Sequence, residues 1–102
     1  MSERHFVCRL EDLSDGKAFP VTVDDYEVVL IRHGDEVHAL EDNCSHQDFP
    51  LSQGEVLPDR VRCRAHGAEF CLKTGKALKA PAFAAVRAYE TGVEDGRVWV
   101  ET

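Results

Sequence analysis

Two short motifs constrain this chain more than any other feature of its sequence. Cys44-Ser45-His46 and Cys63-Arg64-Ala65-His66 each hold a cysteine close to a histidine, and sixteen residues separate the two motifs. In a strand or a turn, side chains two or three residues apart can point toward one place. The chain is therefore expected to bring two loops together, where they offer two thiolates and two imidazoles.

This ligand set suits either a tetrahedral zinc ion or an iron-sulfur cluster in which histidines replace two cysteines. Zinc sites usually pair two cysteines in one motif and two histidines in the other, whereas each motif here is mixed. The mixing favours the cluster, and a structural zinc module that recruits a partner is the alternative. Either histidine alone could be an ordinary polar residue near a turn, but both lie at a fitting offset from a cysteine.

The rest of the sequence predicts an all-β fold. Apolar segments between turn signals predict strands at 6–10, 19–23, 27–32, 36–40, 86–89 and 98–100. Turns are expected at 14–16, 24–25, 33–35, Gly92 and 95–96, and loops between 43 and 81. Pro20 cannot donate to a ladder, so its segment should lie at a sheet edge or begin after the proline. Trp99 is expected to pack in the core.

Length and charge limit the organisation and the partners. The 102 residues fit a single domain, 1–102, with a metal-binding subdomain at about 43–81. No run approaches the roughly 20 apolar residues of a membrane span, and the first residues lack the pattern of a secretory signal, so a cytoplasmic protein is expected. A net charge of −7 argues against nucleic acid and anionic membranes. It agrees with a basic protein partner or with solubility alone.

The spacing of the two motifs resembles the Rieske signature. Leu51-Ser52-Gln53-Gly54 and Thr74-Gly75-Lys76 are similar to segments of the Rieske-type ferredoxins of bacterial aromatic ring-hydroxylating dioxygenase systems. The resemblance implies an antiparallel β-sandwich with one [2Fe-2S] cluster at its tip, between two ligand loops. It also implies that Cys44 and Cys63 bind the inner iron, and His46 and His66 the outer, exposed iron.

The sequence departs from the high-potential respiratory Rieske proteins, which carry a disulfide beside the cluster. Phe49 and Ala65 stand where those proteins have the two cysteines. Ala68 and Phe70 stand where they have a serine and a tyrosine, whose hydroxyl groups donate to cluster or cysteine sulfur. Such donors stabilise the reduced cluster, so we expect a potential at the low end of the roughly −150 to +300 mV Rieske span.

Three further features carry expectations of their own. Pro81, within Ala80-Pro81-Ala82, resembles the proline of the loop that covers the cluster in this family. Phe49-Pro50-Leu51 forms either an apolar rim for a partner or a packing contact with the base. Cys8 and Cys71 are expected to be small apolar residues without a disulfide or a redox role, with Cys71, near the ligand loop, packed under the cluster without ligating it.

The resemblance implies a soluble, monomeric one-electron carrier between a flavin-containing ferredoxin reductase and a terminal oxygenase. The family's oxygenases add a mononuclear iron held by two histidines and a carboxylate. Only His5, His33 and His38 remain here, so no enzymatic activity and no catalytic residue are expected. The alternative is a small Rieske subunit of a larger enzyme such as nitrite reductase.

Overall fold

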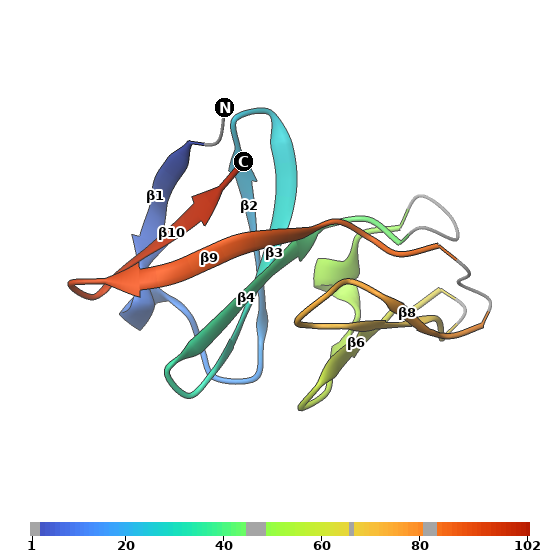
Figure 1. Ribbon diagram of the computed structural model, residues 1–102. Helices are drawn as coiled ribbons and strands as arrows, with labels where there is room; N and C mark the ends of the chain where they lie inside the picture. Colours follow the sequence, from blue (N-terminus) through green and yellow to red (C-terminus); the bar gives the residue numbers. More distant parts are fainter. Residues whose placement is uncertain (1–2, 45–48, 66, 81–83) are drawn as a thin grey trace.

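The fold consists of two antiparallel sheets in a computed structural model that describes residues 3–44, 49–65, 67–80 and 84–102. The larger sheet, called the base here, has the strand order β1-β10-β9-β4-β3-β2. The smaller sheet has the order β5-β6-β7-β8 and lies beside the base, at the right of Figure 1. The strands of the base are β1 (Arg4–Arg9), β2 (Ala18–Val23), β3 (Tyr26–His33), β4 (Glu36–Glu41), β9 (Ala88–Glu94) and β10 (Arg97–Glu101). The strands of the smaller sheet are β5 (Glu55–Val56), β6 (Arg60–Arg62), β7 (Glu69–Cys71) and β8 (Ala77–Lys79), and two short 3-10 turns are η1 (Leu10–Asp12) and η2 (Leu51–Gln53).

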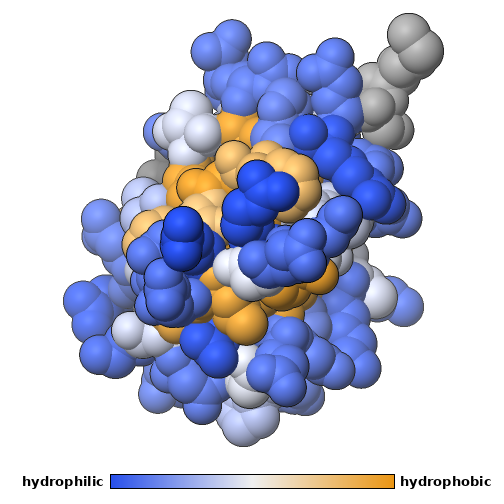
Figure 2. Space-filling model, turned by 90° about the vertical axis from the view of Figure 1, so that its left-hand side faces the viewer, coloured by the Kyte–Doolittle hydropathy of each residue, from blue (hydrophilic) through white to orange (hydrophobic). Residues whose placement is uncertain are grey.

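The base folds over on itself, so that β1, β10 and β9 face β4, β3 and β2. One core cluster fills the space between these halves, with Leu30 of β3 on one side and Val98 and Val100 of β10 on the other. The expected sandwich is therefore confirmed. Figure 2 shows apolar surface on the end of the base that faces away from β6 and β8, and the exposed apolar residues of β1 and β9 include Phe6 and Val93.

Strand β3 is buried on both faces. Val28 and Leu30 point into the core of the base, whereas Val29 and Ile31 belong to a second core cluster beneath the smaller sheet. All four side chains have no exposed surface. The unbroken apolar run of this strand thus reflects two cores that share one strand.

Most of the turns are confirmed. The β3–β4 turn has Gly34 at φ 62°, and the turns at Asp24-Asp25 and Asp95-Gly96 also have positive φ. Such backbone favours glycine, asparagine and aspartate. Pro20 lies in β2, an edge strand of the base, as expected.

Two expectations for the C-terminal strands are wrong. Gly92 does not form a turn but lies inside β9, which begins at Ala88. Trp99 is half-buried outside both core clusters; its ring covers Gly92, where a Cβ would lie 2.6 Å from Trp99 Cζ2. The Arg4 guanidinium also lies over this ring, with its Cζ 4.0 Å from the ring centroid. The ring therefore fills the space that the glycine leaves open.

The segment expected to be loops is also more regular than expected. Residues 51–79 contain one 3-10 turn and the four strands of the smaller sheet. These strands are two or three residues long, so they are too short to display an alternating pattern in the sequence. Among the described residues, no helix has the length and hydropathy of a membrane span.

Candidate metal centre

The segment predicted to be the first ligand loop, residues 43–50, follows β4 and includes Cys44. The Cys44 side chain is 1% exposed, and its backbone N–H donates to the carbonyl of Phe49 over 2.9 Å. Behind this loop the buried carboxylate of Asp42 accepts hydrogen bonds from the backbone N–H (2.7 Å) and the hydroxyl (2.8 Å) of Ser52. These contacts hold together the described residues on either side of 45–48, next to Cys44.

The second ligand loop, residues 63–68, connects β6 and β7 and has the same closure. Cys63 is 1% exposed, and its N–H donates to the carbonyl of Ala68 over 2.7 Å. Gly67, at φ 78°, donates back to the carbonyl of Cys63 over 3.0 Å. In each loop, then, a buried cysteine bonds through its N–H to the carbonyl five residues later.

A glycine allows close approach between the backbone segments that adjoin the two ligand loops. Gly54 follows the first loop, and a Cβ built on it would lie 2.2 Å from the carbonyl oxygen of Arg62, the residue before Cys63. Gly75 has a similar contact, because its Cβ would lie 2.1 Å from the carbonyl oxygen of Val86. The two segments whose sequence resembles Rieske-type ferredoxins are thus places of close backbone approach.

The two cysteines lie in one core cluster. Cys44 and Cys63 share it with Leu51, Val61 and Phe70, and no disulfide joins them. Each of these buried cysteines lies in a segment that is closed by a backbone hydrogen bond. The two thiols are therefore suited to be thiolate ligands of a metal centre, bound from its buried side. Among the described residues no group of three or more histidine, cysteine, aspartate or glutamate side chains gathers as a metal site. His46 and His66, the other two predicted ligands, lie outside the described residues.

Apolar side chains surround the cysteines. Phe49 and Ala65, at the positions of the respiratory disulfide, are partly buried and pack against the same core cluster. Ala68 and Phe70 are fully buried in it. Leu51 is fully buried as well. Of the two interpretations of Phe49-Pro50-Leu51, an apolar rim or a packing contact, Leu51 therefore forms the packing contact. Pro81 lies outside the described residues.

The two remaining cysteines differ from each other. Cys8 is half-buried against the core of the base, and burial raises the pKa of its thiol. Cys71 is half-buried outside both core clusters, so it does not pack in the core that holds Cys44 and Cys63, where packing under the cluster would place it. A hydrogen bond with the Thr74 side chain lowers the pKa of the Cys71 thiol. Both are free thiols.

The other three histidines lie on the base. His5 lies near the hydroxyl of Thr102, at 3.2 Å. His33 Nε2 lies 3.2 Å from the carbonyl oxygen of Leu57, a contact between the base and the residue that follows β5. Burial is the main cause that lowers the pKa of His38, whose ring lies 6.3 Å from that of His33. None of them joins the two cysteines in a cluster of described metal-binding side chains.

Sequence reasoning missed a group of charged residues beside the second ligand loop. Glu69 of β7 is only 5% exposed, and Arg60 and Arg62 of β6 both donate to it. The alternation of Arg60, Val61 and Arg62 was the available signal, because it places the two arginines on one face of a strand. The expectation of loops in this segment concealed it.

Comparison with known proteins yields one family and several close folds. Residues 3–90 match the model of the Rieske [2Fe-2S] domain. The 3-phenylpropionate/cinnamic acid dioxygenase ferredoxin subunit of Photorhabdus laumondii is 38% identical over 96 residues, which cover 93% of this chain and 90% of that protein. The ferredoxin in a complex of reduced oxygenase and oxidised ferredoxin in carbazole 1,9a-dioxygenase has a TM-score of 0.89 and 31% identity, over 95% of this chain and 91% of that one. A small subunit of an NADH-dependent nitrite reductase from Mycobacterium tuberculosis has a TM-score of 0.90 and 25% identity, over 100% of this chain and 96% of that one.

Proposed function

Because this chain belongs to the Rieske [2Fe-2S] family, we propose that Cys44, His46, Cys63 and His66 hold its cluster. The observation that carries this proposal is the pair of buried cysteines in two loops closed by the same backbone hydrogen bond. The spacing of the two histidines from these cysteines completes a mixed ligand set. The cluster, when bound, takes up and returns one electron.

The residues around the cysteines have separate tasks in this function. Cys44 and Cys63 supply thiolates from the buried side of the site, and their loop closures fix the direction of each. Ala68 and Phe70 exclude water there without offering a side-chain hydrogen bond. Such an apolar surrounding disfavours the more negative, reduced cluster, which agrees with a potential low in the Rieske span.

Like its relatives, which are ferredoxin subunits of dioxygenases, the chain is an electron-transfer component and not an oxygenase. We infer that it receives electrons from a flavin-containing ferredoxin reductase and passes them to a terminal oxygenase that acts on an aromatic compound. The oxygenase complex of a carbazole dioxygenase ferredoxin supports the second partner. No disulfide joins any of the four cysteines, two of which are proposed ligands, and this agrees with a reducing cytoplasm.

Electron paramagnetic resonance of the dithionite-reduced protein, with iron and zinc content, tests the ligand set. Mixed histidine and cysteine ligation should give an average g clearly below that of an all-cysteine cluster. The iron content should be about two irons per chain, which corresponds to one [2Fe-2S] cluster. His46→Cys and His66→Cys should each move the spectrum toward the all-cysteine type. Zinc without such a signal would overturn the proposal and leave a structural module.

A second candidate function is a small subunit of a nitrite reductase, favoured by the TM-score of 0.90 with such a subunit. Its 25% identity is lower than the 38% identity with the dioxygenase ferredoxin subunit. A free monomer that is reduced by a separate flavin reductase supports the ferredoxin. Obligate co-purification with a large subunit would support the alternative.

A further inference from the structure

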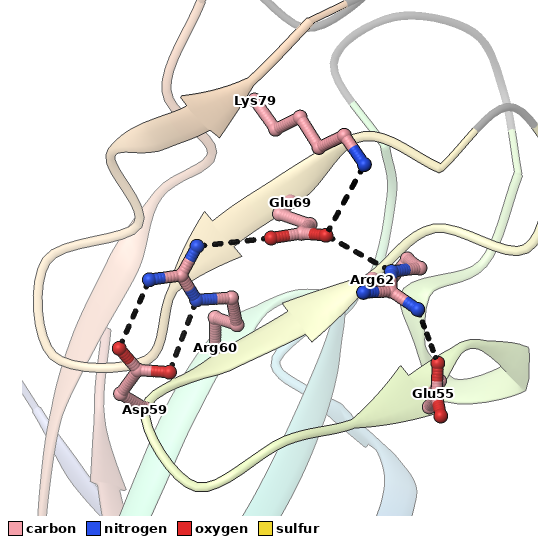
Figure 3. Close-up of polar contacts among 6 residues, drawn as sticks. All are labelled: Glu55, Asp59, Arg60, Arg62, Glu69 and Lys79. Carbon is pink, nitrogen blue, oxygen red and sulfur yellow. Dashed lines mark hydrogen bonds and ion pairs between the residues drawn. The ribbon is translucent and has the colours of Figure 1, made fainter.

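A network of charged side chains covers the outer face of the smaller sheet. Its centre is the Glu69 carboxylate, which accepts hydrogen bonds from Arg60 Nη1 and Arg62 Nε, each over 2.9 Å (Figure 3). Lys79 of β8 approaches the same carboxylate at 3.8 Å. The two arginines hold the pKa of Glu69 below its usual range, so this carboxylate is charged at neutral pH.

The network continues to both sides of its centre. Arg60 also donates to Asp59 through Nε (3.0 Å) and Nη2 (3.1 Å). Arg62 also donates to Glu55 of β5 over 2.8 Å. Three acids and three bases thereby connect all four strands of the smaller sheet, and Glu69 is the one most deeply buried.

The position of this network relative to the second ligand loop is specific. Arg62 and Glu69 are directly opposed across β6 and β7, and they form the last pair before the loop opens. Arg62 is bonded directly to Cys63, and Glu69 follows Ala68, whose carbonyl accepts the Cys63 N–H. The inner neighbours Val61 and Phe70 meanwhile pack in the core cluster.

Ion pairs around a buried carboxylate are weak evidence for a contribution to stability. Taking ionised groups out of water is costly, and buried ion pairs exchanged for apolar residues often leave stability unchanged. Two guanidinium groups that converge on one carboxylate do, however, fix the relative position of the groups that carry them. The ends of β6 and β7 that adjoin the second ligand loop are therefore held at a fixed separation and in a fixed register.

We propose that Glu69 is a positioning residue for the second ligand loop, where its carboxylate holds Arg62 and Arg60 so that Cys63 stays directed at the cluster. This inference rests on the proposed ligand set. Without the carboxylate, two arginines on one face of β6 repel each other, and the ends of β6 and β7 are free to shift. The cluster then samples several geometries and is released faster.

The test compares Glu69→Gln with Glu55→Gln in the cluster-loaded protein. Each variant removes one negative charge from a partner of Arg62, so the change in net charge is the same. Only Glu69 joins the two strands that lead into the ligand loop. The readouts are the rate of bleaching by an excess of an iron chelator and the linewidth of the reduced-state resonance spectrum.

We expect Glu69→Gln to release the cluster about tenfold faster, the lower end of the effects seen for residues that orient metal ligands, with broader lines at unchanged average g. Glu55→Gln should match the wild type in both readouts. Equal behaviour of the two variants would overturn the proposal. If Glu69→Gln does not fold, Glu69→Asp and Glu55→Asp make the same comparison with the charge kept. A wild-type spectrum without mixed ligation would instead refute the proposed function.

Discussion

Substitution of Gly54 by alanine tests the close backbone contact between Gly54 and Arg62, the residue before Cys63. Gly54 has φ −84°, which any residue adopts, so the effect of the new methyl group comes from its contacts alone. The methyl carbon would lie 2.2 Å from the Arg62 carbonyl oxygen, and an ordinary contact requires the backbone next to Cys63 to move by about 1 Å. Overpacking of this kind costs about 1–3 kcal/mol.

The unfolded state reduces this cost slightly, because alanine has less backbone freedom than glycine, by about 0.4–1 kcal/mol. The net loss is then about 1–2 kcal/mol, which lowers the melting temperature of a domain of this size by about 5–15 °C. Circular dichroism reports the unfolding, and visible absorbance reports the loss of the cluster. Both are needed, because proteins with metal centres often unfold in more than two states.

Gly34→Ala is the matched control. Gly34 has φ 62° and nothing within 4 Å of its Cβ, so alanine there is strained only in its own backbone, at a cost of about 1–2 kcal/mol. Both variants should melt earlier, but only Gly54→Ala should bleach faster than the wild type at a temperature below unfolding. Equal bleaching rates in the two variants would refute the reasoning.

Three further predictions concern the base, the core and the first ligand loop. Burial lowers the pKa of His38, so the unfolded state binds the proton more tightly and stability should fall as pH drops below about 6.5; urea titrations of His38→Gln should show a weaker fall over that range. Ala68→Ser with Phe70→Tyr adds hydroxyl groups at two fully buried positions and should raise the potential by tens of millivolts, whereas an unchanged potential in redox titration would contradict the assigned role of these positions. Asp42→Asn weakens the two bonds from Ser52 and should cost about 1 kcal/mol in urea denaturation, and a value near zero would show that this contact does not stabilise the loop.

The sequence predicted the base better than the smaller sheet. Turns such as Gly34 with its neighbours are determined locally, because a positive φ needs particular residues, and strand β3 has enough apolar residues to be recognised. Trp99 was placed wrongly because its packing partner, Gly92, lies on the neighbouring strand. Gly92 was interpreted as a turn signal, but it is the position over which the Trp99 ring packs.

The candidate site was only partly predictable. Cys44 and Cys63 were predicted as ligands because their chemistry is rare and their spacing is fixed, and the structure buries both in one core cluster. The role of Gly54 was hidden, because the residue it touches, Arg62, follows only after a short hairpin. The Glu69 network was hidden for a related reason. Strands of three residues are stabilised by cross-strand partners and not by their own pattern.

The burial of β3 on both faces has a consequence for protein engineering. Among the residues that the structure describes, the smaller sheet shares its core with the base, since Val29 and Ile31 of the base pack against Val61 and Phe70. A segment that carries both ligand loops is therefore not an independent module. Chimeras between members of this family should accept foreign ligand loops only when the donor's inward-facing residues match that shared core in volume, while the outward-facing charges can be redesigned as a separate layer.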